Sequence, residues 1–120
     1  MKMMRSPLDG LKVLELARVL AGPWAGQLLA DLGAEVIKVE SPIGDETRKW
    51  GVDSLNNNSS YFKCTNRGKS SFVANFKKKN ELEMVQHLAK NADVIIENYK
   101  VNNLKEYKLD YKNIKKINKS

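Results

Sequence analysis

The pattern of apolar and polar residues is most regular between residues 11 and 40, where it predicts a strand, a helix and a second strand. Lys12–Leu16 is a short apolar run of the kind shown by strands buried on both faces. Pro23 stands where a helix would have its first residue, and Gly33 supplies the stop. Glu35–Glu40 is rich in β-branched residues and predicts the second strand. Together these elements form a βαβ unit with a right-handed crossover.

The predicted helix carries a stripe of large apolar residues. Trp24, Leu28 and Leu32 fall on one helical face, with Ala25 and Leu29 beside them. A tryptophan in such a stripe more often anchors the core or a loop than it stacks on a ligand. We interpret Trp24 as an anchor of this kind.

The rest of the chain alternates loops with shorter predicted elements. Ser70–Phe76 and Asp93–Tyr99 are the third and fourth strand candidates, and Asn80–Lys90 has apolar residues at helical spacing. The other expected elements are a helical turn at Glu46–Trp50, an exposed loop at Val52–Ser60, and short helices at Asn103–Tyr107 and Tyr111–Asn118. This order predicts an α/β protein with a Rossmann-like, mainly parallel sheet and helices on both faces.

Composition and charge exclude several classes of function. The 21 basic and 14 acidic residues give a net charge of +7, but the late lysines are mixed with Asn and Ile and form no recognition motif. A solvated surface is therefore favoured over nucleic-acid binding. Cys64 is the single cysteine, so neither an internal disulfide nor a metal cluster is expected. No membrane span or signal region is found, which favours a cytoplasmic protein.

The loop Arg18–Gly22, after the first strand, is the first candidate binding site. Ligands of open α/β sheets bind at the carboxyl ends of the strands, where helix N-termini favour phosphates. Every βαβ unit needs a loop at this point, so spacing alone leaves a phosphate site and a plain connection equally open. A nicotinamide-dinucleotide domain is a further alternative, because Glu40 ends the second strand, although G-x-G-x-x-G is absent.

Five separated blocks of residues resemble the class III CoA-transferase (CaiB/BaiF) family. They are PLDGLKVLELARVLAGPWAGQLLADLGAEVIKVESPIGDETRKWG, Tyr61-Phe62, Asn66-Arg67-Gly68-Lys69, Glu97-Asn98-Tyr99 and Leu109-Asp110-Tyr111. The blocks keep the order and approximate spacing of the family from Pro7 to Asn118. The resemblance implies an enzyme that moves coenzyme A from an acyl-CoA thioester to a carboxylate, with coenzyme A as a substrate and no tightly bound cofactor. A fragment similar to the related α-methylacyl-CoA racemases is the alternative.

The resemblance also implies which residues contact coenzyme A. The loop after the first strand is expected to lie against the nucleotide, and the residues that follow the third and fourth strands are expected to join it. Lysine side chains there suit phosphates, and an asparagine can bond a ribose or adenine edge. The implied contacts are Val19, Leu20, Ala21, Asn75, Lys77, Asn98, Tyr99 and Lys100.

No catalytic residue is assigned within the chain. In the family an aspartate attacks the acyl-CoA and forms first an anhydride and then an enzyme–CoA thioester. The resemblance places that aspartate after Ser120, so we expect residues 1–120 to be the N-terminal part of the CoA-binding domain and to be inactive alone. Full-length relatives form interlocked homodimers. A separately encoded remainder, with this chain as its non-catalytic partner, is the other expectation.

Overall fold

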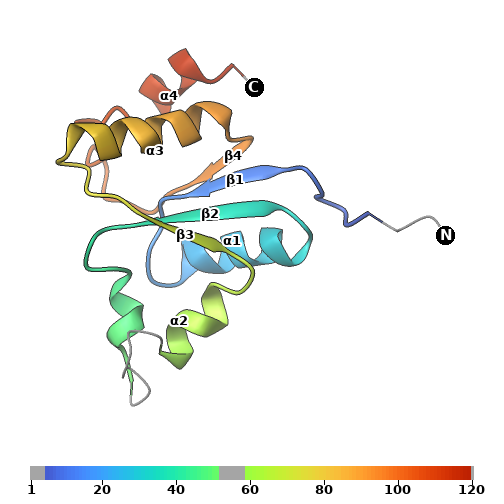
Figure 1. Ribbon diagram of the computed structural model, residues 1–120. Coiled ribbons are helices and arrows are strands. Elements are labelled where there is room, and N and C mark those ends of the chain that lie inside the picture. Colours follow the sequence, from blue (N-terminus) through green and yellow to red (C-terminus); the bar gives the residue numbers. More distant parts are fainter. Residues whose placement is uncertain (1–4, 52–58, 120) are drawn as a thin grey trace.

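A computed structural model of the chain describes residues 5–51 and 59–119, and a four-stranded parallel sheet lies at its centre (Figure 1). The strands are β1 (Lys12–Glu15), β2 (Glu35–Glu40), β3 (Ser70–Val73) and β4 (Val94–Ile96). They lie in the order β3-β2-β1-β4, and all three neighbouring pairs are parallel. The predicted βαβ unit and parallel sheet are therefore confirmed.

Helices cover both faces of the sheet. Figure 1 shows α1 (Ala21–Asp31) on one face and α3 (Lys79–Asn91) on the other, with α4 (Tyr111–Ile117) beyond α3. The 3-10 helix η1 (Glu46–Lys49) contacts α2 (Ser60–Thr65), which in turn contacts α1. This arrangement confirms the α/β prediction. Within the described residues, no helix is both long and apolar enough to cross a membrane.

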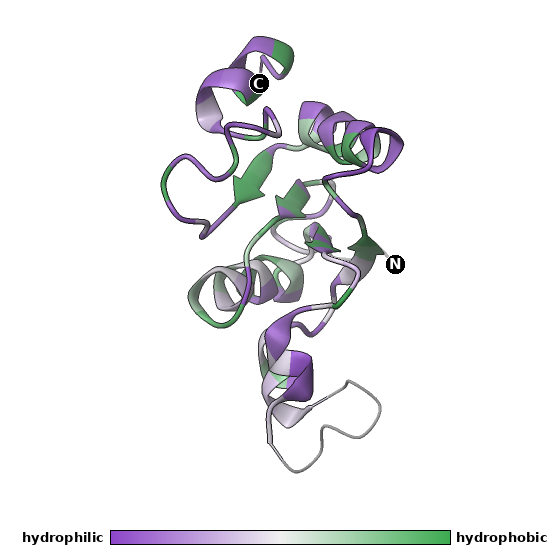
Figure 2. Ribbon diagram, turned by 90° about the vertical axis from the view of Figure 1, so that its left-hand side faces the viewer, coloured by the Kyte–Doolittle hydropathy of each residue, from purple (hydrophilic) through white to green (hydrophobic). Residues whose placement is uncertain are grey.

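The hydrophobic core forms two layers, one on each side of the sheet. On the α3 side, Leu14 of β1 and Leu16, just after the strand, pack with Val85 of α3 and with apolar residues that follow β4. On the α1 side, a smaller cluster is built around Val13 and Val36. Figure 2 shows hydrophobic residues concentrated on the strands between these helices. The smaller apolar cluster does not fill the whole space between the sheet and α1, and the rest of that space holds polar and charged side chains.

The apolar stripe of α1 faces solvent, so the interpretation of Trp24 as a core anchor is wrong. Trp24 is 63% exposed and Leu28 is 58% exposed. The buried residues of the helix are instead Gly22, Pro23, Gly26 and Gln27. Small residues on this face let the helix backbone approach the sheet closely.

We expect Leu28→Gln to change the free energy of unfolding by less than about 0.5 kcal/mol, because an exposed side chain loses little packing. Leu14→Ala is the matched core change, since Leu14 is 1% exposed. It should cost about 2–5 kcal/mol. Urea unfolding of both variants measures the difference. A loss at Leu28 comparable to that at Leu14 would show that α1 packs through its apolar stripe after all.

Several predicted boundaries differ from the structure. The helix α1 begins at Ala21, so Pro23 is its third residue and not its first. The strand predicted over Ser70–Phe76 ends at Val73. The strand predicted over Asp93–Tyr99 covers only Val94–Ile96, because Tyr99 N turns back to bond Glu97 Oε2 at 2.8 Å. In both cases the last residues of the run leave the sheet and form a loop.

The segment Asn103–Tyr107 contains successive turns and is not the predicted helix. Asn102 and Lys108 have positive φ angles of 70° and 54°, which interrupt a right-handed helix at both ends. The helices predicted at Asn80–Lys90 and Tyr111–Asn118 are confirmed as α3 and α4, and the turn at Glu46–Trp50 is confirmed as η1. Most of the loop predicted at Val52–Ser60 lies outside the described residues, and α2, which follows it, was not predicted.

Candidate functional site

The residues implied to contact coenzyme A all lie at the carboxyl edge of the sheet. Val19–Ala21 follow β1, Asn75 and Lys77 follow β3, and Asn98–Lys100 follow β4. Since the strands are parallel, these loops emerge at the same edge. The loops after β1 and β4 are neighbours, whereas β2 separates both from β3.

Asn98 joins the loop after β4 to the loop after β1. Its Oδ1 accepts a hydrogen bond from Arg18 N at 2.9 Å, and its Nδ2 donates to Arg18 O at 2.6 Å. The Arg18 guanidinium then lies over the ring of Tyr99, 5.5 Å from the ring centroid. Burial raises the pKa of the Tyr99 hydroxyl. The Asn98 amide therefore fixes the loop after β1, and its implied contact with the nucleotide stays a prediction.

The backbone of the loop is strained at Val19. Its φ of 71° is in the left-handed region, which a β-branched residue rarely adopts. Val19 N donates to Asp45 Oδ2 at 3.4 Å. No side chain caps the start of α1 at Leu20, and both Leu20 and Ala21 are exposed. Uncapped N–H groups at a helix start favour an anion, which suits a phosphate at this position.

A small pocket brings the loop after β3 next to Tyr99. Asn75, Lys77 and Tyr99 line a cavity of 150 Å³ together with residues that follow β2. Asn75 Oδ1 accepts a hydrogen bond from Lys77 N at 3.0 Å, which turns the chain at the end of β3. The structure thus places Asn75 and Lys77 beside Tyr99, one of the three residues predicted after β4.

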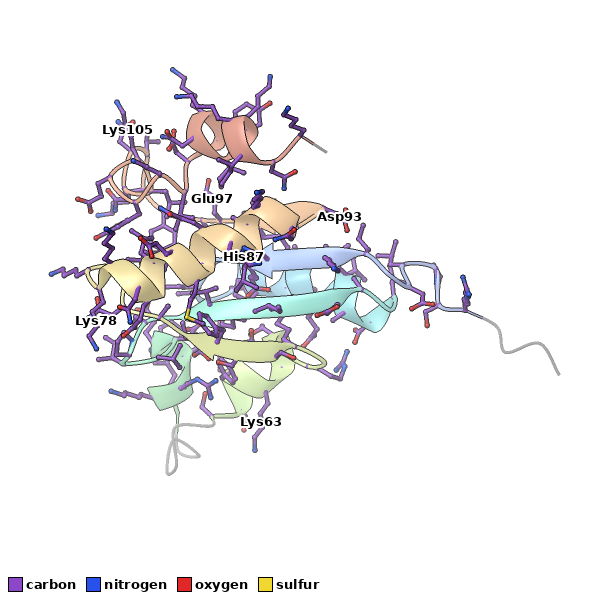
Figure 3. All side chains as sticks on the ribbon, turned by 45° about the horizontal axis from the view of Figure 1, so that its top comes forward. Lys63, Lys78, His87, Asp93, Glu97 and Lys105 are labelled. Atoms are coloured by element: carbon purple, nitrogen blue, oxygen red, sulfur yellow. The ribbon has the colours of Figure 1, made fainter. Side chains whose placement is uncertain are left out.

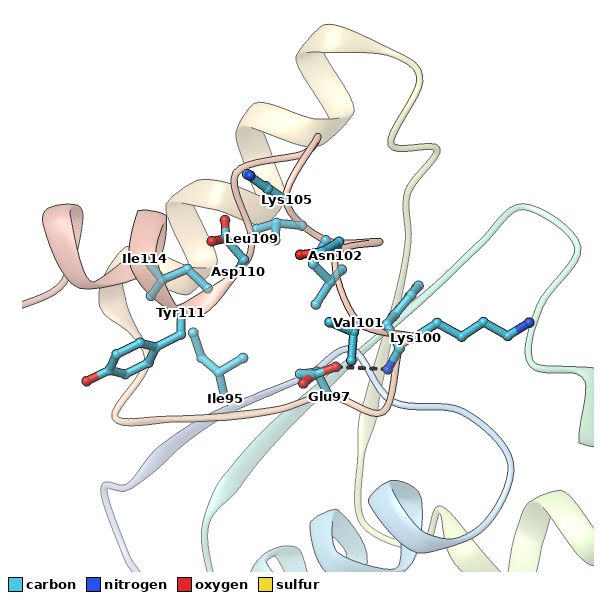
Figure 4. Close-up of a pocket in the computed structure, with 12 residues that line it drawn as sticks. Ile95, Glu97, Lys100, Val101, Asn102, Lys105, Leu109, Asp110, Tyr111 and Ile114 are labelled. Atoms are coloured by element: carbon cyan, nitrogen blue, oxygen red, sulfur yellow. Dashed lines mark hydrogen bonds between the residues drawn. The ribbon is translucent and has the colours of Figure 1, made fainter.

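Lys100, the last of the residues implied after β4, lies beside a second pocket. This pocket of 470 Å³ lies between β4 and α4, and its walls include Ile95, Leu109 and Ile114. Figure 4 shows the Lys100 side chain extending away from this pocket. Figure 3 shows other lysines, including Lys105, also extending outward from the fold. The implied contact of Lys100 with coenzyme A stays a prediction.

A group of buried charges under α1 was not predicted from the sequence. Lys38 Nζ lies 3.0 Å from Glu15 Oε1 and 3.0 Å from Asp45 Oδ2. The other carboxylate oxygen of Glu15 lies 2.7 Å from Lys69 Nζ. Glu15 and Lys38 are direct partners in the β1–β2 register. Each of the two predicted apolar strands carries one charged residue in its interior, and the two charges are opposite. This pattern is the signal that could have revealed the pair.

Hydrogen bonds and burial act in opposite directions on the pKa values of this group. Burial disfavours the charged form of Asp45, but the Thr47 amide and Lys38 outweigh it and lower the pKa of the carboxyl. Burial lowers the pKa of Lys69, although Glu15 opposes the change. Asp45 therefore stays a carboxylate that can hold Lys38 and the Val19 amide.

Glu40 at the end of β2 forms a second buried ion pair. Arg48 donates to both of its carboxylate oxygens, each at 2.7 Å, and the Ser71 hydroxyl and the Asp45 amide also donate to it. Burial disfavours the carboxylate, but these donors outweigh it and lower the pKa of Glu40 to about 2. Both oxygens of Glu40 are thus engaged within the protein, so the structure does not favour the ribose contact considered for a dinucleotide domain.

Comparison with known proteins agrees with the fold. The family described as CoA-transferase family III matches residues 8–120. A succinate–glutarate CoA-transferase of Agrobacterium fabrum is 50% identical over 121 residues, which are 95% of this chain and 30% of the relative. The succinyl-CoA:glutarate CoA-transferase of Mus musculus is 49% identical over 112 residues, which are 92% of this chain and 26% of the relative.

A solved structure has the same fold as this chain. A CaiB/BaiF family protein from Brucella suis matches with a TM-score of 0.90 and 53% sequence identity, over 96% of this chain and 32% of that chain. The chain thus spans about 30% of the length of the curated relative from Agrobacterium. Because the family match extends over nearly all of its residues, the chain belongs to CoA-transferase family III.

Proposed function

We propose that this chain forms the N-terminal part of the CoA-binding, Rossmann-like domain of an acyl-CoA:carboxylate CoA-transferase. The observation that carries the proposal is the loop Val19–Ala21, which lies at the carboxyl end of β1 and leads into an uncapped helix start. A phosphate of coenzyme A would accept hydrogen bonds from backbone N–H groups there. Lys77, exposed beyond β3, would add a cation for a second phosphate.

The chemistry of the proposed reaction needs a carboxylate nucleophile in addition to this site. Attack of an aspartate on the thioester carbonyl breaks the carbon–sulfur bond, forms an anhydride and releases the CoA thiolate. The thiolate then attacks the anhydride, giving an enzyme–CoA thioester and a free carboxylate. The residues described here would hold the nucleotide throughout, so that the thiolate stays near the reacting carbonyl. The aspartate itself would come from another part of the enzyme.

The names of the relatives suggest the acyl groups and the assembly. Succinate and glutarate occur in the names of the Agrobacterium and mouse proteins, so we propose short dicarboxylic acids as acyl groups. We place the enzyme in the cytoplasm, as a homodimer when the remaining sequence is joined to it. A split enzyme, in which a second chain supplies that sequence, is the alternative assembly.

Isothermal titration calorimetry with coenzyme A tests the proposed function. Coenzyme A is expected to bind, whereas pantetheine, which lacks the nucleotide, should bind at least about tenfold more weakly. Lys77→Ala should weaken binding of coenzyme A severalfold by removing a phosphate contact. The matched control is Lys63→Ala, which removes the same charge from an exposed lysine on α2. Equal affinities for coenzyme A and pantetheine would contradict the proposal.

A further inference from the structure

The charges buried beneath the start of α1 need an explanation beyond stability. Glu15, Lys38 and Asp45 are at most 2% exposed, and the side chain of Lys69 is 2% exposed. Replacing buried ion pairs with well-packed apolar residues is often neutral or stabilising. A requirement for stability therefore does not account for four charges at this depth. The backbone atoms that they contact suggest a more specific role.

Three of these side chains contact the backbone of residues 17–23. This segment covers the loop after β1 and the first residues of α1, and we call it the nucleotide loop. The contacts join Lys38 Nζ to Ala17 O at 2.9 Å, Asp45 Oδ2 to Val19 N at 3.4 Å, and Lys69 Nζ to Pro23 O at 2.7 Å. They come from β2, from the loop after β2 and from the loop before β3. The charged group therefore holds the nucleotide loop before, at and after its strained residue.

The conformation of Val19 is evidence that the loop is held in place. A non-glycine residue at a φ of 71° is strained and persists only where the surroundings enforce it. Asp45 bonds the Val19 amide, and Asn98 bonds both backbone groups of Arg18. The strained residue is thus fixed from two sides by other parts of the protein.

We propose that Lys38, Asp45 and Lys69 are positioning residues for coenzyme A binding. Through their contacts with the nucleotide loop they hold its backbone in the conformation that receives a phosphate. A loop that is already ordered loses less conformational freedom on binding, so it binds more tightly. This inference rests on the proposed function, and it assigns the affinity for coenzyme A partly to residues that do not touch it.

The double variant Lys38→Met/Asp45→Asn tests this role by removing one positive and one negative charge together. We expect it to remain folded, because no buried charge is left without a partner: Glu15 keeps Lys69. Calorimetry should show coenzyme A binding about tenfold more weakly. Hydrogen exchange without ligand should show faster exchange of the amides of residues 18–21.

The matched control is Glu40→Gln/Arg48→Met, which removes another ion pair of low exposure. The hydrogen bonds that join Glu40 to Arg48 involve no atom of the nucleotide loop, and the glutamine introduced in place of Glu40 keeps an oxygen for the Asp45 amide. This control should bind coenzyme A within about twofold of the original chain. Its residues 18–21 should exchange at the original rate.

The possible outcomes separate this inference from the proposed function. Unchanged exchange at residues 18–21 in Lys38→Met/Asp45→Asn would overturn the inference, whatever the affinity. If that variant does not fold, Glu15→Gln/Lys69→Met applies the same test at the C-terminal end of the nucleotide loop, where Lys69 contacts Pro23 O. Unchanged exchange of the Gly22 and Trp24 amides, which flank Pro23, would then overturn the inference equally. An original chain that binds no coenzyme A would contradict the proposed function, while faster exchange in the variant would still support anchoring of the loop.

Discussion

Gly26→Ala is expected to lower the free energy of unfolding by about 3 kcal/mol, although alanine is normally the better helix former. A methyl group at this position would overlap Oε2 of Glu15 and would lie 3.1 Å from its Cδ and 3.3 Å from Lys69 Cε. Because Glu15 is fully buried and paired with both lysines, it cannot move aside without separating charges. Urea unfolding of the variant measures the loss.

The matched control for this change is Ala25→Gly, one residue earlier on the exposed side of the same helix. It should cost about 1 kcal/mol through helix propensity alone. The two substitutions thus exchange the same two residues in opposite directions, and both are expected to destabilise. If Gly26→Ala stabilised the protein, as propensity alone predicts, the close approach of α1 to Glu15 would be wrong.

Acid is expected to remove about 3 kcal/mol of stability through Glu40 between pH 4.5 and pH 2. The pKa of Glu40 falls from 4.5 to about 2 on folding, so the native state binds this proton less readily than the unfolded state. The stabilisation is therefore fully present above pH 4.5 and is lost as the pH falls through the folded pKa. A shift of this size corresponds to about 3 kcal/mol.

The measurement is urea unfolding of the original chain and of Glu40→Gln at several pH values. The difference in free energy between the two should shrink by about 3 kcal/mol from about pH 5 to about pH 2. Other carboxyls with lowered pKa values, such as Asp45, titrate in both proteins and so cancel in the comparison. A difference that stays constant with pH would show that Arg48 does not hold the Glu40 carboxylate.

The sheet could be predicted from the sequence because its strands are short apolar runs separated by clear turn signals. β1 and β2 fall where Lys12–Leu16 and Glu35–Glu40 predict them, and α3 and α4 follow their apolar spacing. The orientation of α1 could not be predicted in this way. Helical periodicity identifies the stripe of large apolar residues, whereas packing here depends on Gly22 and Gly26, which bring the backbone next to the sheet.

The candidate site could be located from topology but not described in detail. A loop between a parallel strand and a helix must emerge at the carboxyl edge, so the position of Val19–Ala21 followed from the predicted βαβ unit. The role of Asn98 did not follow, because sequence cannot show whether an amide turns toward a ligand or toward Arg18. The Glu15–Lys38 pair was missed because each charge stands alone within an apolar run of its own strand.

The proposed function requires the loop after β1 to receive the nucleotide of coenzyme A. The most direct measurement is titration of the nitrogen-15-labelled chain with coenzyme A, followed by amide chemical shifts. The amides of Val19, Leu20 and Ala21 are expected to shift most, with smaller changes at Asn75 and Lys77 beyond β3. Shifts confined to the pocket lined by Ile95 and Leu109, with the loop unchanged, would contradict the proposed function.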